Sequence, residues 1–234
     1  MSNTSSITVN PLIYKDISYD PERDFDPITT VISYPLVLTV STTSDKTKNV
    51  KTVKDLVELA KSQKTPLNYG SAGIGNLFHI TGAQFNNEAG ITATHVPYRG
   101  GAPMQVALMA GEVDYAFDTL ASIPLIKDGR VRALAVTEDK RWRDLPDVPT
   151  IDEAGYPAVH VSPWMAVFAP KGTPPDVLKK VHDALNLLST DSGLRERMER
   201  HGRVVIMSPE AFKKQIADET AVNKEVVKRE AISQ

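Results

Sequence analysis

The chain has 234 residues, of which 41% are hydrophobic and 24% are charged, and its formal net charge is −2. This apolar content is enough for a buried core, and the charges are mixed without a basic block, which argues against a nucleic-acid-binding protein. The absence of cysteine excludes disulfides, thiolate nucleophiles and cysteine-based zinc sites, and no apolar run approaches the roughly 20 residues of a membrane-spanning helix.

The N-terminal quarter is predicted to pass from loops to a strand and then a helix. Residues 1–27 are rich in proline and polar residues and are expected to form loops, and residues 28–41 predict an extended strand interrupted near Pro35. Thr52 and Asp55 then fit a capping box ahead of an apolar helical stripe, which predicts the start of a helix.

From that helix onward, short strands and helices follow one another in regular order. Strands are expected at residues 67–70, 94–98, 113–118 and 131–137, and a helix is expected after each of the first three. Alternation of this kind predicts an α/β fold with a mainly parallel sheet that is covered by helices on both faces.

The C-terminal part is predicted to be mainly helical. Residues 138–160 are rich in proline and charge and are expected to be a surface connection, and residues 162–170 a strand. The helix that follows is opened by two prolines, and its apolar stripe is expected to be buried. That stripe consists of Val177, Leu178, Val181, Leu185 and Leu188. Two more helices are expected near residues 191–201 and 209–230.

These patterns divide the chain into two parts. Residues 44–133 form a self-consistent α/β unit. The flanks, residues 1–43 and 134–234, contain strands and helices but no complete sheet of their own. We therefore expect one complete lobe and one partial lobe.

A glycine-rich stretch, NYGSAGIGN at residues 68–76, lies between a strand and a helix. It lacks the lysine of a Walker A loop, its glycine spacing differs from the dinucleotide fingerprint, and Ser71 directly follows Gly70, which does not match a nucleophile elbow. Two interpretations remain. One is a tight turn without a ligand, and the other is an anion site made by free N–H groups at a helix start, with Ser71 and Asn76 as side-chain donors.

Two further features lie at strand ends in the same part of the chain. The sequence VPYRGGAPM, residues 96–104, repeats the order of strand, glycines and helix start, and Arg99 is either a partner for a carboxylate or a solvated surface residue. Asp118 ends another strand. In open α/β sheets, ligands bind outside the carboxyl ends of the strands, so the convergence of these features favours a binding site.

Histidine and aromatic residues leave alternatives open. His79 either lies near a ligand or makes a local hydrogen bond, and Trp164 either packs in a core or lines a ligand cleft. The five histidines do not have the spacing of a metal site. An α/β hydrolase or transferase would rest on the glycine loop alone, because no nucleophile, base and oxyanion hole come together. We expect a binding protein without metal, cofactor or enzymatic activity.

The order of motifs along the chain resembles the substrate-binding proteins of tripartite tricarboxylate transporters, the TctC or Bug family. The motifs that carry the resemblance are LNYGSAGIGN, HVPYRGGAP, VDYAFD, KDGRVRALAVT, LPDVPTIDEAGYP and WMAVFAPKGTPP. Each motif is weak alone, but their combination is specific, and the resemblance covers residues 7–230.

The resemblance implies a periplasmic receptor with the two-lobe, Venus-flytrap architecture of type II periplasmic binding proteins. Such a receptor captures a small mono-, di- or tricarboxylate by cleft closure, without chemistry, and passes it to permease subunits in the membrane. Residues 44–133 would form one lobe and the flanks the other. The ligand-binding positions of the family correspond to Ser71, Ala72, Gly73, Gly75, Asn76, Tyr98, Arg99, Gly100, Gly101 and Asp118.

The N-terminus departs from the family pattern. The sequence MSNTSSITVNP lacks the basic and apolar layout of a signal peptide, so the chain as written is expected in the cytoplasm, although the resemblance implies the periplasm. The first strands of the family, with their Pro-Gly-Gly loop, have no counterpart, so one lobe is expected to be incomplete and to expose apolar faces, including that of the helix at residues 177–188. An alternative function is therefore a truncated or repurposed family member that acts as an interaction module without transport.

Overall fold

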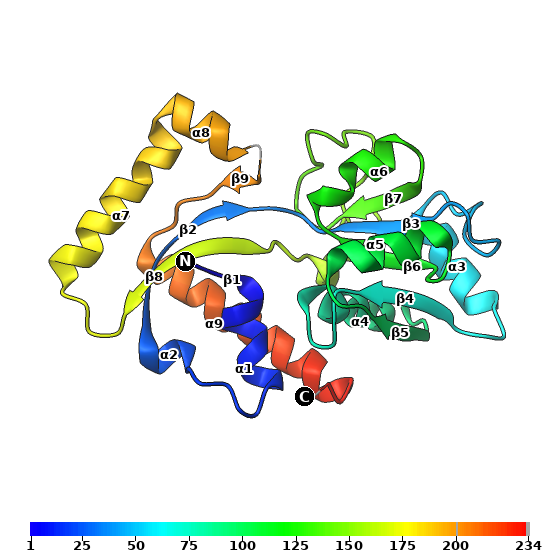
Figure 1. Cartoon of the computed structure of the whole chain (residues 1–234), viewed down its shortest axis with the longest axis horizontal. Helices are drawn as coiled ribbons and strands as arrows, with labels where there is room; N and C mark the ends of the chain where they lie inside the picture. Colours follow the sequence, from blue (N-terminus) through cyan, green and yellow to red (C-terminus); the bar gives the residue numbers. More distant parts are fainter. Residues whose placement is uncertain (200, 233–234) are drawn as a thin grey trace. The chain divides into compact units, whose positions relative to one another are not determined.

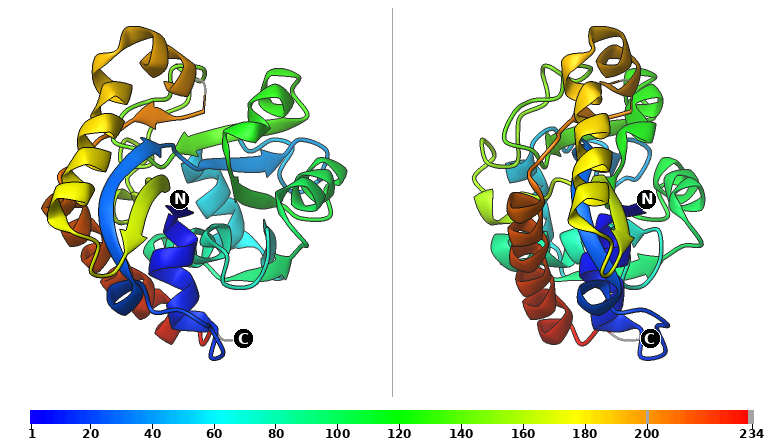
Figure 2. Two further views of the ribbon diagram at one scale, coloured as in Figure 1. Left: turned by 60° about the vertical axis from the view of Figure 1, so that its left-hand side comes forward. Right: turned by 90° about the vertical axis from the view of Figure 1, so that its left-hand side faces the viewer.

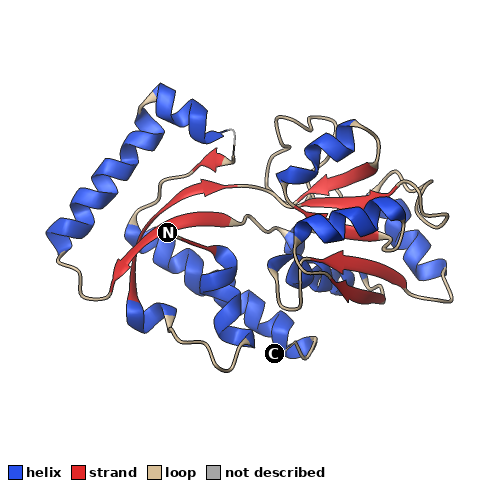
Figure 3. Ribbon diagram, viewed as in Figure 1, coloured by secondary structure: helices blue, strands red, loops and turns tan. Residues whose placement is uncertain are grey.

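The computed structural model describes residues 1–199 and 201–232. The chain folds into two compact units, unit 1 with residues 1–34 and 163–234 and unit 2 with residues 35–162. Each unit has its own sheet with helices packed beside it (Figure 1 and Figure 3).

The sheet of unit 2 has the strand order β5-β4-β6-β3-β7. The strands are β3 (Val37–Ser41), β4 (Leu67–Ser71), β5 (Ala93–Pro97), β6 (Tyr115–Asp118) and β7 (Val131–Val136). Strand β4 runs parallel to β5 and β6, whereas β3 is antiparallel to β6 and β7. Four of the five strands thus point the same way, which confirms the expected, mainly parallel sheet. The carboxyl ends of β4, β5 and β6 consequently lie at one edge.

Local signals explain where the helices of unit 2 begin and end. The helical segments are α3 (Val53–Ser62), α4 (Leu77–Ala89), α5 (Gly101–Ala110), α6 (Ile123–Lys127) and the short turns η2 (Leu120–Ser122) and η3 (Pro157–Val159). The predicted capping box of α3 is confirmed, because the N–H of Asp55 donates to Thr52 Oγ1 and the N–H of Thr52 donates to Asp55 Oδ2. Helices α4 and α5 end at Gly90 and Gly111, whose φ angles of 60° and 77° favour glycine.

Helices cover both faces of the unit 2 sheet, as successive residues of β6 show. Tyr115 and Phe117 point to one face, where Phe85 of α4 packs edge-on against both rings, with centroid distances of 6.3 and 5.8 Å. Ala116 points to the other face and shares a buried cluster with Met104 of α5. Because side chains alternate along a strand, α4 and α5 lie on opposite faces.

The sheet of unit 1 is antiparallel, with the strand order β1-β8-β2-β9. Its strands are β1 (Ser2–Asn3), β2 (Phe25–Ser33), β8 (Trp164–Pro170) and β9 (Arg203–Val204). The accompanying helices are η1 (Ser5–Val9), α1 (Asn10–Ile13), α2 (Pro21–Asp24), α7 (Pro175–Thr190), α8 (Ser192–Glu199) and α9 (Pro209–Arg229). Trp164 and Phe212 meet in the core, with ring centroids 4.9 Å apart.

The prediction of loops throughout residues 1–27 is wrong, because η1, α1 and α2 lie there. Pro11 and Pro21 occupy the first turns of α1 and α2, where a missing N–H breaks no helical hydrogen bond. Asp20 caps α2 by accepting hydrogen bonds from the N–H groups of Glu22 and Arg23. The prolines therefore start helices in this region.

Residues 28–41 do not form one interrupted strand, because β2 belongs to unit 1 and β3 to unit 2. The hydrogen-bond partners change on either side of Pro35. The N–H of Tyr34 donates to the Pro163 carbonyl over 3.0 Å, whereas the N–H of Leu36 donates to Thr137 Oγ1 over 2.9 Å. Pro35, which has no N–H, marks the point where the chain leaves one sheet for the other.

Helix α7 does not bury its apolar stripe, which differs from the expectation drawn from its periodicity but agrees with the expectation that the 177–188 helix has an exposed apolar face. None of its residues is buried: in the stripe, Val177 is 41% exposed and the other four residues are partly exposed. Helices α7 and α9 both contact β2 (Figure 2). Helix α8 ends at Glu199, and position 200 of the helix expected near residues 191–201 lies outside the described residues.

Candidate functional site

Two loops that each lead from a strand into a helix lie side by side in unit 2. The first, residues 70–76, joins β4 to α4, and the second, residues 97–101, joins β5 to α5. Their backbones are linked, because the N–H of Tyr98 donates to the Ser71 carbonyl over 2.9 Å. A Cβ atom on Gly73 would lie 3.7 Å from the Tyr98 carbonyl oxygen, so the two loops are in close contact.

Glycine is required at three positions of these loops by the backbone itself. Gly73, Gly75 and Gly100 have φ angles of 138°, 70° and 108°, a region that other residues rarely adopt. Gly101 begins α5 close to the first turn of α4, since a Cβ there would lie 3.9 Å from Phe78 Cε2. The glycines thus bring two helix starts together at the carboxyl edge of the sheet.

The polar side chains of the first loop are bound within the loop itself. Ser71 is fully buried, and its hydroxyl donates to the Gly73 carbonyl over 2.9 Å and accepts from the Gly73 N–H over 3.2 Å. The amide oxygen of Asn76 caps α4 by accepting from the N–H of Phe78. The N–H of Gly75 donates to Nδ1 of His79 over 3.1 Å. These groups shape the loop, whereas the sequence led us to expect Ser71 and Asn76 to face an anion.

The start of α5 has a different character. Gly100 stands at its N-cap position and has no side chain that could accept a hydrogen bond, so the N–H groups of Gly101 and Ala102 are left without a side-chain cap. Pro103 follows and has no N–H. Arg99, just before the helix, is exposed. The positive end of the helix dipole therefore lies next to an exposed arginine in the chain.

Asp118, at the carboxyl end of β6, is 2% exposed and connects to α5. Its Oδ2 accepts a hydrogen bond from Gln105 Nε2 over 2.9 Å, and its Oδ1 accepts from the N–H of Thr119 over 2.7 Å. Burial raises the pKa of Asp118 to about 6, although both hydrogen bonds act in the opposite direction. This carboxyl group changes charge close to neutral pH.

Two histidines contact the two ends of the first loop. The imidazole rings of His79, on α4, and His95, on β5, are stacked with centroids 3.6 Å apart and planes 4° from parallel. Nε2 of His95 lies 2.6 Å from the Ser71 hydroxyl. For His79, the contact with Gly75 is the local hydrogen bond that the sequence left open as one alternative.

His95 was not singled out from the sequence. The signal that could have found it is strand register: aligning the loop ends of β4 and β5 pairs Tyr69 with His95, as in the structure, where their rings lie 5.0 Å apart. Residues 69 and 71 share one face of β4 because side chains alternate, so a histidine paired with Tyr69 is brought near Ser71.

The short contact between Ser71 and His95 does not make a catalytic dyad. The Ser71 hydroxyl is completely buried, and it already donates to the Gly73 carbonyl. A nucleophile must reach its substrate, and this oxygen has no accessible surface. Among the described residues, no group of three or more histidine, aspartate or glutamate side chains is placed to hold a metal ion.

Trp164 does not lie with the other predicted site residues. It belongs to unit 1, is 1% exposed, and packs against Phe212. Its indole N–H donates to both carboxylate oxygens of Glu219, over 3.1 and 3.0 Å. The structure therefore places it in a core, which is one of the two roles that the sequence left open.

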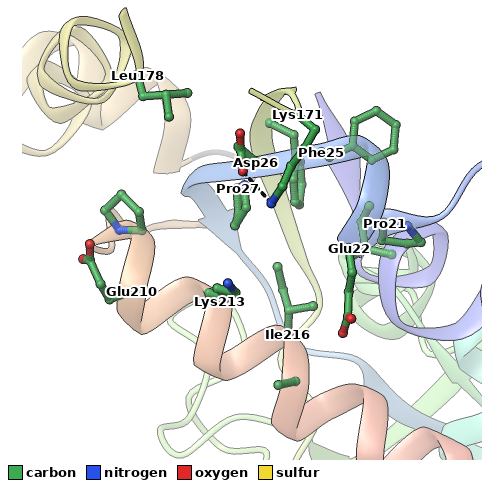
Figure 4. Close-up of a pocket in the computed structure, with 14 residues that line it drawn as sticks. Pro21, Glu22, Phe25, Asp26, Pro27, Lys171, Leu178, Glu210, Lys213 and Ile216 are labelled. Carbon is green, nitrogen blue, oxygen red and sulfur yellow. Dashed lines mark ion pairs between the residues drawn. The ribbon is translucent and has the colours of Figure 1, made fainter. Parts of the chain in front are cut away.

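Unit 1 also contains a hollow of about 530 Å³. Leu178 of α7 and Ile216 of α9 border it from two sides (Figure 4). Asp26 and Lys171 form an ion pair of 2.9 Å at its edge, and the Lys171 hydrogen bond lowers the pKa of Asp26. The lining is otherwise mostly apolar, and the first turns of α2 and α9 that reach it carry side-chain caps and the acidic residues Glu22 and Glu210, which do not favour an anion.

Comparison with known proteins gives one consistent answer. Residues 1–232 match the family described as "Tripartite tricarboxylate transporter family receptor". A UPF0065 protein of Pseudomonas sp. strain P51 is 37% identical over 186 residues, which cover 79% of this chain and 54% of that protein. The chain thus spans about half the length of this relative. In the described residues, none of the helices combines the length and the apolar character needed to cross a membrane.

Solved structures that resemble this chain agree with the family match. R. palustris Rpa4515 with adipate is 33% identical with a TM-score of 0.84, and the match covers 99% of this chain and 77% of that one. MatC from Rhodopseudomonas palustris with bound malate is 25% identical with a TM-score of 0.77, and the match covers 97% and 77% of the two chains. The likeness confirms the expected fold class, that of TctC and Bug periplasmic binding proteins.

Proposed function

The chain belongs to the tripartite tricarboxylate transporter receptor family, and from this premise we propose that it is a solute-binding receptor that captures a small carboxylate at the paired loops of unit 2. The family consists of receptors and not enzymes, in agreement with the expectation from the sequence. Delivery of the solute to permease subunits, and action in the periplasm, form part of the proposal because they follow from the family's role.

The observation that supports the site most strongly is the pairing of two helix starts. The Tyr98–Ser71 backbone hydrogen bond holds the loops together, and α4 and α5 both begin within this pair. Unpaired N–H groups and the dipole of a helix favour an anion at its N-terminus, and two helix starts together favour it more.

Within this pair, we assign the direct contacts mainly to α5. The N–H groups of Gly101 and Ala102 lack a side-chain cap, and the exposed Arg99 can pair with a carboxylate through two hydrogen bonds. The first loop contributes the surface against which the ligand rests. The loop positions in the proposed site are Ser71, Ala72, Gly73, Gly75, Asn76, Tyr98 and Gly100.

Asp118 is proposed to influence the choice of ligand through its charge, because it is 2% exposed and both of its oxygens already accept hydrogen bonds. An ionised carboxylate near an anion site repels further acidic groups and favours a ligand that carries a hydroxyl or an amine there. Two similar proteins were solved with adipate and with malate, and only malate carries a hydroxyl group. We therefore propose a dicarboxylate as the ligand class, with Asp118 selecting among dicarboxylates.

Titration calorimetry tests this function. Adipate and malate should release or absorb heat on binding, whereas adipamide, the neutral diamide of adipate, should not. Replacing Arg99 by Gln removes the charge and should weaken dicarboxylate binding by about tenfold or more, the effect of losing at least one charge-assisted hydrogen bond. The matched control is Arg130→Gln, an exposed arginine of the same unit that lies away from the two loops. Equal heat with adipate and adipamide would contradict an anion site.

A further inference from the structure

Each imidazole of the stacked pair holds one end of the first loop. His95 contacts the hydroxyl of Ser71, where β4 ends, and His79 accepts the N–H of Gly75, next to the start of α4. The rings are in van der Waals contact with each other, with centroids 3.6 Å apart. The loop between these two anchors is therefore tied to a single aromatic stack that draws one ring from a helix and the other from a strand.

The hydrogen bonds fix the protonation of both rings. A backbone N–H can only donate, so Nδ1 of His79 must be the unprotonated nitrogen and its proton must lie on Nε2. The Ser71 hydroxyl gives its one hydrogen to the Gly73 carbonyl, so Nε2 of His95 donates to it. With both rings neutral, each of these three hydrogen bonds has one donor and one acceptor.

We propose that His79 and His95 act as a positioning pair whose neutral, stacked rings hold the first loop in the shape that receives the ligand, and that uptake of a proton by His79 releases the Gly75 end of the loop. The inference rests on the proposed function for its consequence, since a loop that is no longer held in place should bind the carboxylate less well. We call the contacts of His79 with Gly75 and of His95 with Ser71 the lock. The lock is a property of the protein without ligand.

A proton on Nδ1 of His79 would point at the Gly75 N–H, and two donors cannot share a hydrogen bond. The titratable groups that face the rings are Tyr69 of β4, whose ring centroid lies 5.0 Å from His95 and 6.1 Å from His79, and Tyr115 of β6, which stacks on Tyr69. Burial raises the pKa of Tyr115 well above its usual value, so this ring stays uncharged.

Burial opposes charge on both imidazoles. It lowers the pKa of His79 to about 4, and burial together with the neighbouring His79 lowers the pKa of His95 to about 3. The pair is therefore neutral at pH 7, and the lock is engaged under ordinary conditions. Release requires acid or a substitution.

A matched pair of variants tests the lock. In His79→Asn, the side-chain oxygen branches from Cγ as Nδ1 does and can accept a hydrogen bond from the Gly75 N–H. In His79→Leu, the leucine side chain has nearly the shape of asparagine but no acceptor. We expect solvent exchange of the Gly75 amide, measured by NMR, to rise about five- to tenfold in His79→Leu and to stay within about twofold in His79→Asn. His160→Asn, an exposed histidine in the same unit, serves as the control.

The wild-type exchange rate also has a predicted pH profile. After correction for intrinsic exchange, Gly75 should lose protection as the pH falls toward 4, and His79→Asn should not show this step. A two-dimensional imidazole nitrogen spectrum at pH 7 should place the His79 proton on Nε2. Equal Gly75 exchange in the Leu and Asn variants, or a His79 proton on Nδ1, would overturn the lock.

Dicarboxylate titration of the same variants separates the two proposals. If the exchange pattern is as expected and His79→Leu binds adipate about tenfold more weakly than His79→Asn, the lock and its link to binding are both supported. If the exchange pattern is as expected but the wild-type protein binds no dicarboxylate, the proposed function fails and the lock stands.

Discussion

Gln105, in the second turn of α5, donates a hydrogen bond of 2.9 Å to Asp118 at the end of β6. The contact joins the helix whose start is proposed to bind the ligand to a buried carboxyl group at this edge of the sheet. Because Asp118 has little access to water, its charge is balanced mainly by Gln105 and the N–H of Thr119.

Replacing Asp118 by Asn should change how stability depends on pH. Burial raises the pKa of Asp118 to about 6 from 3.8, so the folded state holds its proton more tightly than the unfolded state. This contribution to stability is complete below pH 3.8 and is lost as the pH rises through 6. The free energy of unfolding of Asp118→Asn, relative to wild type, should therefore rise by about 2 to 3 kcal/mol from pH 4 to pH 7. Urea titrations at several pH values would measure it, and a constant difference would contradict the shifted pKa.

His79 should make the free energy of unfolding depend on pH in the opposite direction. The pKa of His79 is lowered to about 4 from 6.5, so the unfolded state binds the proton more readily. Its contribution to stability is complete above pH 6.5 and is lost as the pH falls through 4. Relative to His79→Asn, which does not titrate, the wild-type protein should lose about 3 kcal/mol of unfolding free energy over this window. If the unfolding free energies of the two proteins changed in parallel with pH, His79 would bind its proton equally well in the folded and the unfolded state.

Gly82→Ala should destabilise unit 2, although alanine is normally the better helix former. A Cβ on Gly82 would lie 2.6 Å from Cε2 and 2.8 Å from Cδ2 of Tyr69, which is too close for the ring to stay in place. We expect a loss of about 1 to 3 kcal/mol from overpacking, measured by thermal unfolding. Gly193→Ala, in α8, is the matched control: the nearest atom to its Cβ lies at 3.4 Å, and the exchange should be neutral or stabilising by up to about 1 kcal/mol.

Trp164→Phe should lower stability without changing dicarboxylate affinity, because Trp164 is a core residue of unit 1. The substitution removes both indole hydrogen bonds to Glu219, whose pKa burial already raises. A loss of about 2 kcal/mol is expected. Trp142→Phe in unit 2 is the comparison, since the buried indole N–H of Trp142 has no hydrogen-bond partner among the described residues, and it should cost less. A changed dicarboxylate affinity of Trp164→Phe without a change in stability would indicate that Trp164 belongs to the binding site.

Local chemistry made much of unit 2 predictable. The capping box at Thr52 and Asp55 is a short-range signal that the structure confirms, and the Asn76 N-cap and the glycine at the end of α5 are signals of the same kind. The alternation of strands and helices was enough to expect the mainly parallel sheet and to bring the two glycine loops to one edge. These features depend on residues that are near one another in sequence.

Features set by long-range pairing were not predictable in this way. The β-branched run at residues 28–41 looks the same on both sides of Pro35, and only the partner strands decide that its halves enter different sheets. The stacking of His79 on His95 depends on the register of β4 against β5 and on the position of α4. The engagement of the Ser71 hydroxyl inside its own loop likewise required three-dimensional positions, and it moved the proposed anion contacts toward Gly101 and Ala102.

The most direct test of the carboxylate site is to follow the backbone amides of the nitrogen-15-labelled protein by NMR while adding adipate or malate, with adipamide as the neutral control. We expect the largest shifts at Gly101 and Ala102 and smaller ones at Gly73, and we expect adipamide to produce none of them. Shifts centred on Phe168 and Lys213 around the hollow of unit 1, or no shifts with either dicarboxylate, would contradict it.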